Sequence, residues 1–203
     1  MLADVNLAAV WIAIGGAAIL AMSVAGAARS TIPVGETRVF RIINGAPDWL
    51  YWPLWLPMQL GNLVVGTVVG LLVAWSLGSW GVAIGVILAM VLKLAIERLV
   101  RQKMAPYLKV RQRPGTSQHA AILRGADVPH EGPSFPSGHV ILVAAVGTVL
   151  NSHLDPSVVW IPYAFAVLVA LGRVYVGAHN PLDVLAGLGA GLAVGGAIAM
   201  LIR

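Results

Sequence analysis

The sequence contains no cysteine, and this absence removes several kinds of chemistry at once. A chain without thiols forms no disulfide, offers no thiolate nucleophile and builds no cysteine-ligated zinc or iron–sulfur site. Charged residues are also scarce, at 10% of the chain, whereas soluble globular domains have roughly 25%. Hydrophobic residues make up 59% instead, so we expect the chain to lie in a membrane.

Long apolar runs take up most of the chain. No Asp, Glu, Lys or Arg occurs over residues 7–28 or 50–92, and a membrane-spanning helix needs about 20 apolar residues. Turn-forming residues divide the apolar sequence into six predicted membrane helices, near residues 7–28, 54–77, 81–98, 138–153, 158–176 and 182–202. We therefore expect an all-α fold, a bundle of six transmembrane helices that forms one domain over residues 1–203, with its core over 50–202.

The N-terminal segment and the net charge indicate what kind of membrane protein this is. Its start lacks the basic residues of a secretory signal, and the first apolar run is long for a cleaved one, so we expect a retained first helix. The net charge of +5 is not carried by a soluble basic domain. Membrane lipid is therefore the expected partner, and nucleic acid is not.

Six spans would place the loops over 29–53, 99–137 and 177–181 on one face of the membrane, opposite both termini. Most of the arginines and lysines lie on that face, which favours a cytoplasmic location by the positive-inside rule. Substrate binding is the other explanation for the same cations. The unusual polar residues lie in the third and fifth loops, where we expect the active site.

The first loop carries an interfacial signal. Residues 39–44 place apolar side chains around a basic one, and four aromatic residues follow within a dozen positions. This pattern predicts a segment at the membrane interface. It would serve either as an aromatic anchor for the second span or as a lid over the site.

A short polar segment, Pro136-Ser-Gly-His139, precedes an apolar run that starts at Val140. Ser137 stands at the expected N-cap of a helix, whose free N–H groups and dipole favour an anion. Gly138 would let a phosphate group approach the backbone closely. Capping alone explains Ser137, but it does not explain His139, because an ionisable side chain in a membrane helix is costly unless it has a function.

A second polar group contains Arg173, His179 and Asp183. Asn180 and Pro181 suit the N-cap and the first position of the last helix, so Asp183 would lie within its first turn. We expect Asp183 to accept a hydrogen bond from one nitrogen of His179. A histidine held by a carboxylate in this way can act as a nucleophile or a base.

Arg113 in the third loop adds a planar guanidinium, which matches the oxygens of a phosphate group. The alternative to a phosphate site is a metal site built from His139, His179 and Asp183. The arginine donors favour an oxyanion over a divalent cation, so phosphate is the preferred interpretation.

Three motifs occur together: Arg113-Pro114, Pro136-Ser-Gly-His139 and Arg173-x5-His179-x3-Asp183. In this order they resemble the type 2 phosphatidic acid phosphatase superfamily, over about residues 50–200. The resemblance implies a bacterial integral membrane lipid phosphatase that works without a metal ion or other cofactor. It also implies that His179 is the nucleophile that forms a phosphohistidine, that Asp183 orients it, and that His139 is the general acid.

The resemblance further implies a phosphate-binding set. Its members in this chain are Arg113, Ser137, Gly138 and Arg173.

The chain departs from the family pattern at two positions. Pro106 stands where the family has a lysine seven residues before the Arg-Pro pair; we expect Lys109 to substitute for it, with Lys103 or Arg111 as further options. Gly172 stands where the family has a serine before the arginine. These departures concern phosphate affinity more than the reaction.

The expected function is hydrolysis of a lipid phosphate, as a phosphomonoester or a diphosphate. A polyprenyl diphosphate, phosphatidate or phosphatidylglycerophosphate would each suit the site. One alternative is a lipid phosphotransferase that passes the phosphate to an alcohol. Another is a transporter or binding protein that holds a lipid phosphate through Arg113 and Arg173 without hydrolysing it.

Overall fold

A computed structural model describes residues 7–29, 31–100, 102, 111–126 and 128–202. Within these residues the regular structure is helical, apart from one isolated bridge between Gln112 and Pro133. The elements are α1 (Leu7–Ala27), α2 (Val34–Asn44), η1 (Asp48–Leu50), α3 (Tyr51–Met58), η2 (Gln59–Gly61), α4 (Leu63–Ser76), α5 (Trp80–Leu99), α6 (Pro114–Ser117), α7 (Gly138–Asn151), α8 (Ile161–Tyr175) and α9 (Pro181–Leu201). The predicted all-α fold is confirmed.

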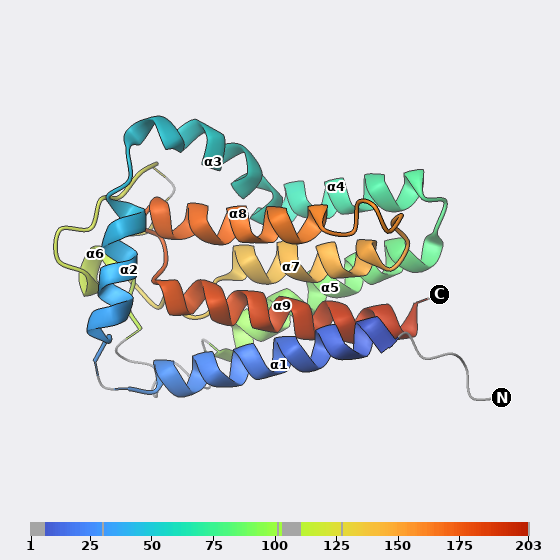
Figure 1. Cartoon of the computed structure of the whole chain (residues 1–203), viewed down its shortest axis with the longest axis horizontal. Helices are drawn as coiled ribbons and strands as arrows, with labels where there is room; N and C mark the ends of the chain where they lie inside the picture. Colours follow the sequence, from blue (N-terminus) through green and yellow to red (C-terminus); the bar gives the residue numbers. More distant parts are fainter. Residues whose placement is uncertain (1–6, 30, 101, 103–110, 127, 203) are drawn as a thin grey trace.

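The long helices lie roughly parallel, and α7 is at their centre (Figure 1). It packs against α4, α5, α8 and α9, and nearly all its residues are buried. The amphipathic helix α2 lies across one end of the bundle, while α1 begins and α9 ends at the other end (Figure 1). The central position of α7 means that its first residues are surrounded by the ends of its neighbours.

Small residues bring α1 and α9 into close contact. A Cβ added at Gly16 would lie 2.5 Å from the backbone nitrogen of Ala193, and one at Gly189 would lie 2.6 Å from that of Leu20. Side chains at these positions would push the helices apart. This is the small-residue packing that helices use in lipid, where close backbone approach replaces the hydrophobic driving force.

Apolar helices long enough for a membrane are present among the described residues. Helices α1 and α9 pass by length and composition, and the bent pair of residues 48–61 and 63–76 raises the number to three if it counts as one span. Helices α7 and α8 are apolar but shorter, with 14 and 15 residues. The protein is therefore a membrane protein, and the arrangement of six spans remains a prediction.

The second predicted span, near residues 54–77, is not one continuous helix. It bends by 74° between α3 and α4. Asn62 has extended backbone angles, and its side-chain oxygen accepts hydrogen bonds from the N–H groups of Val64 and Val65 at 3.0 and 3.3 Å. This N-cap starts a new helix at Leu63. The sequence-based prediction of a single helix is wrong here, because Asn62 lies within the apolar run but caps a new helix instead of continuing the first one.

Described residues of the loops over 29–53 and 99–137 meet at the α2 end of the bundle. Asn44 at the end of α2 donates to the carbonyls of Ile122 at 2.7 Å and Tyr175 at 2.9 Å. Its side-chain oxygen accepts from the N–H of Ile122 at 2.8 Å. A single buried amide thus joins α2, the third loop and the end of α8.

Candidate active site

A cavity of about 270 Å³ lies where the ends of α5, α7 and α8 meet the third and fifth loops. Its lining includes Arg113, Gly138, His139, Arg173 and His179. These residues come from all three motifs. The tertiary structure therefore brings most of the predicted site residues to one place, and their catalytic roles remain predictions.

His179 is 4% exposed, and its Nδ1 lies 2.8 Å from the carbonyl oxygen of Ser134. A carbonyl only accepts hydrogen bonds, so Nδ1 carries the proton and Nε2 keeps its lone pair. Burial lowers the pKa of His179 well below its usual value, and the charges of Arg173 and Arg113 lower it further. At neutral pH the imidazole is thus uncharged, which is the form a nucleophile requires.

Asp183 does not hold His179 in the expected way. Its Oδ2 lies 4.0 Å from Nδ1 of His179 and accepts a hydrogen bond of 2.8 Å from the backbone N–H of Asn180. Asn180 stands at the N-cap of α9 and Pro181 follows at the first position, as predicted. Asp183 therefore stabilises the turn that carries His179, while the carbonyl of Ser134 orients the ring. A backbone acceptor leaves no mark in the sequence, which is why Ser134 was not assigned this role.

Arg111 joins two carboxylates in the interior. It is 2% exposed, donates to both oxygens of Glu36 at 2.9 and 2.7 Å and contacts Oδ1 of Asp183 at 3.1 and 2.7 Å. Burial alone would lower the pKa of Arg111, but the hydrogen bonds and charges of Glu36 and Asp183 raise it. Because its donors are directed to carboxylates, Arg111 is unsuitable as the substitute for the missing lysine.

Glu36 was not recognised from the sequence. It lies in the first turn of α2 and also accepts a hydrogen bond of 3.0 Å from the N–H of Leu182. The available signal was a single acid in an otherwise basic amphipathic segment.

Ser137 stands at the N-cap of α7, as predicted, but its side chain makes no capping hydrogen bond. Its hydroxyl is buried and has no partner among the residues that the structure describes. The Ser137 backbone packs against α9, since a Cβ at Gly187 would lie 2.6 Å from the Ser137 carbonyl oxygen. Pro136, Gly138 and His139 of this motif line the cavity, and Ser137 is not part of the lining. Lys109, the predicted substitute lysine, lies outside the described residues, as do Lys103 and Pro106.

Both arginines of the cavity also support the turn before α9. Arg113 Nη1 donates to the carbonyl of Ala178 at 2.9 Å. The carbonyl of Arg173 accepts from the N–H groups of Ala178 and His179 at 3.0 and 3.2 Å. Gly172, one departure from the family pattern, packs against α3, because a Cβ there would lie 2.6 Å from Cγ of Met58. A serine side chain at this position would require the Met58 side chain of α3 to move aside.

The alternative metal site is not assembled in the part of the chain that is described. No group of three His, Asp or Glu side chains there is placed to hold a metal ion. His139 and His179 line the cavity, whereas the oxygens of Asp183 are engaged by Arg111 and Asn180. The donor set of the cavity suits an oxyanion.

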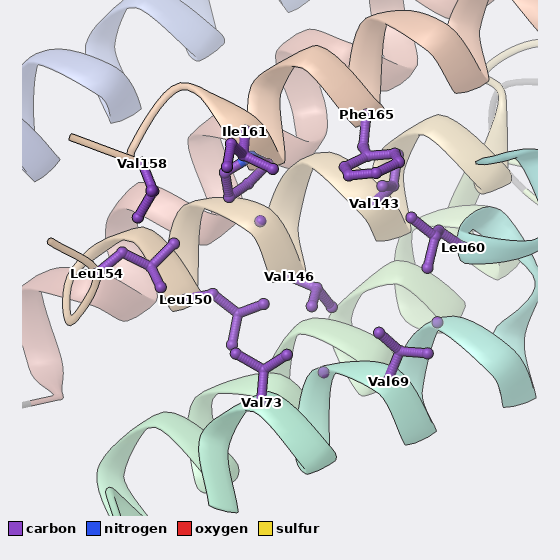
Figure 2. A pocket seen from close by; sticks show the side chains of 14 residues that line it. Leu60, Val69, Val73, Val143, Val146, Leu150, Leu154, Val158, Ile161 and Phe165 are labelled. Carbon is purple, nitrogen blue, oxygen red and sulfur yellow. The ribbon is translucent and has the colours of Figure 1, made fainter. Parts of the chain in front are cut away.

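An apolar groove of about 360 Å³ begins close to this cavity and runs between α4, α7 and α8 (Figure 2). Val143, Val146 and Leu150 form its α7 wall, and they share one helical face with His139. At the near end of the groove, Leu60 adjoins Gly61, where a Cβ would lie 2.6 Å from Cβ of His139. The groove thus starts within one helical turn of the polar cavity.

Comparison with known proteins gives one consistent family. The model of the PAP2 superfamily matches residues 78–203, which contain all three motifs. The chain is 49% identical over 55 residues to the undecaprenyl-diphosphatase of Sulfolobus acidocaldarius, a match that covers 27% of this chain and only 26% of that protein. It is 30% identical over 165 residues to the putative undecaprenyl-diphosphatase YbjG of Escherichia coli, covering 76% of each chain.

Two solved structures share the fold. LpxE of Aquifex aeolicus has a TM-score of 0.63 and 24% identity, with 81% of this chain and 93% of that chain covered. The transmembrane PAP2 type phosphatidylglycerolphosphate phosphatase of Bacillus subtilis has a TM-score of 0.66 and 20% identity, with 91% and 94% covered. The family model spans more than half of the chain and agrees with the resemblance carried by the three motifs. The chain belongs to the PAP2 superfamily.

Proposed function

We propose that the chain is a six-span membrane enzyme that hydrolyses a lipid phosphate through a phosphohistidine on His179, without a metal ion or cofactor. The observation that carries this proposal is the neutral, buried His179, whose Nε2 has a free lone pair in a cavity that also contains His139 and two arginines. Relatives named undecaprenyl-diphosphatase support a lipid substrate.

In the first step, Nε2 of His179 attacks phosphorus, and the bond from phosphorus to the lipid oxygen breaks. His139, in its protonated form, gives its proton to that leaving oxygen and becomes neutral. Arg113 and Arg173 compensate the charge on the other phosphate oxygens, which is the main requirement of phosphoryl transfer. The Nδ1–H bond to the carbonyl of Ser134 stabilises the positive charge that develops on the imidazole.

In the second step, a water molecule gives a proton to His139 and its oxygen attacks phosphorus. The bond between phosphorus and Nε2 breaks, inorganic phosphate leaves, and both histidines return to their starting states. Asp183 takes no direct part and acts as a positioning residue through the turn over 177–180.

Two neighbouring spaces support the proposed substrate class. The polar cavity suits a phosphate or diphosphate head group, and the groove of Figure 2 suits an apolar tail that continues along α7. A polyprenyl diphosphate, phosphatidate and phosphatidylglycerophosphate all combine these parts. The excess of cations near the cavity favours a cytoplasmic location for this end of the bundle.

The first prediction concerns the reaction itself. The purified protein in detergent is expected to release inorganic phosphate from at least one of these three lipids, at a rate that excess EDTA leaves unchanged. A short water-soluble phosphomonoester serves as the control and should be a poorer substrate because it cannot occupy the groove. The absence of phosphate release, or a loss of activity in EDTA that a divalent metal restores, would contradict the proposal. A phosphorylated alcohol in place of free phosphate would indicate transfer.

The second prediction concerns pH. His179 must be neutral to attack, so activity falls as pH decreases through its pKa, which lies well below the ordinary value near 6.5. Because the charge of Arg113 helps to lower this pKa, Arg113→Gln is expected to move the acid limb of kcat/KM to higher pH. The pH profiles of wild type and variant are recorded with the same lipid, so that ionisation of the substrate affects both profiles equally. Arg98→Gln, which removes an exposed cation of α5, should leave the limb in place, and an unmoved limb in Arg113→Gln would refute the assignment.

A further inference from the structure

Lys93 and Glu97, one turn apart on α5, face the same cavity as the predicted catalytic residues. Lys93 Nζ and Glu97 Oε2 form an ion pair of 2.9 Å, and their side chains are only 10% and 20% exposed. Ionisable groups within an apolar helix are costly and are seldom placed there for packing alone. The location of this pair therefore needs a reason beyond the stability of α5.

The pair lies against the first residue of α7. A Cβ at Gly138 would clash with Oε1 of Glu97 and would lie 3.0 Å from Cε of Lys93. The N-terminus of a helix carries partial positive charge and favours anions, so an ammonium group beside it is disfavoured unless an anion lies nearby. Glu97 supplies one negative charge at this point.

The charge of the cavity is unbalanced in the described lining. Lys93, Arg113 and Arg173 are positive and Glu97 is negative. Two histidines complete the ionisable groups of the lining, and His179 is neutral there. A phosphate group bound in the cavity would lie near these three cations and near the N–H groups at the start of α7.

We propose that Lys93 supplies the ammonium group of the phosphate site, and that Glu97 holds this ammonium group at the start of α7 while the site is empty. The inference rests on the proposed function, and it replaces Lys109 as the lysine that the family pattern requires. Lys93 lies twenty positions before Arg113, so no fixed motif spacing identifies it. A bound phosphate would share Lys93 with Glu97 and would be repelled by the Glu97 carboxylate.

Binding of inorganic phosphate to the full chain in detergent, measured by calorimetry, tests this assignment. Lys93→Met is expected to weaken binding about ten- to hundredfold, the range of a hydrogen bond to a charged group. Glu97→Gln is expected to strengthen binding, because it removes the one negative charge of the described lining and leaves Lys93 free for phosphate. A purely structural ion pair would give effects of the same sign in both variants.

Arg98→Met is the matched control, since it removes an exposed positive charge from the same helix outside the cavity lining. Its phosphate affinity should equal that of the wild type, and thermal unfolding of each variant separates lost binding from lost fold. The assignment would be overturned if wild type and Lys93→Met bound phosphate with equal affinity, or if neither bound it. Weaker phosphate binding by Glu97→Gln would also overturn it. Phosphate binding can be measured without turnover. If the protein hydrolyses no lipid phosphate but its affinity for phosphate still depends on Lys93, the proposed function is refuted and the Lys93 phosphate site is supported.

Discussion

Replacing His179 with glutamine is expected to abolish phosphate release, with a fall in kcat on the order of 10⁴-fold or more, as for other catalytic nucleophiles. Glutamine keeps a polar side chain of similar size at the position where Nδ1 of the wild-type ring donates to the carbonyl of Ser134 at 2.8 Å. The fold should therefore persist while the attacking lone pair is lost. Phosphate release from the preferred lipid, together with thermal unfolding in detergent, measures the two effects separately.

A labelled intermediate makes this test specific for covalent catalysis. After brief reaction with a lipid carrying radioactive phosphate and quenching in alkali, the wild type should retain label on the chain, and His179→Gln should not. The matched control is His119→Gln, the same substitution at an exposed histidine of the third loop, which should label and turn over like the wild type. Normal turnover by His179→Gln, or label on its chain, would exclude His179 as the nucleophile.

Arg111→Met is expected to cause the largest loss of stability. The change leaves the carboxylates of Glu36 and Asp183, whose side chains are 9% and 0% exposed, buried without their cation. Breaking a buried pair in this way costs about 3–5 kcal/mol. Since Asp183 also supports the turn that carries His179, activity should fall together with the unfolding temperature.

A second change at the same contact identifies its cause. Adding Glu36→Gln to Arg111→Met removes one uncompensated carboxylate, so the double variant should unfold at a higher temperature than the single variant. Arg41→Met, the same substitution at an exposed position of α2, should have little effect. If Arg111→Met unfolds at the temperature of the wild type, the buried contact does not stabilise this end of the bundle.

Local features of the site could be read from the sequence. Asn180 and Pro181 begin α9 where capping preferences placed them, because a cap depends on residues within one turn. The break at Asn62 is equally local, and its capping signal was present but was outweighed by the apolar run around it.

Partners that are distant in the chain could not be predicted. Arg111 meets Glu36 across 75 positions, and His179 meets the carbonyl of Ser134 across 45. No pattern in the sequence encodes these pairs, because they depend on how the third loop folds over the ends of the helices. The predicted hydrogen bond between His179 and Asp183 is absent for the same reason, because the carbonyl of Ser134 in the third loop lies closer to Nδ1 than the Asp183 carboxylate does.

Composition and apolar runs alone determined that this is a helical membrane protein, because scarce charge and long hydrocarbon segments leave no other stable environment. The three motifs alone predicted its family, because their residues and their order resemble those of the PAP2 superfamily, whose model matches the chain. Only the tertiary structure decided which groups lie next to one another. It places the carbonyl of Ser134 beside His179, two carboxylates beside Arg111, and Lys93 in the lining of the cavity. Each of these depends on distances between elements, and spacing along the chain does not set those distances.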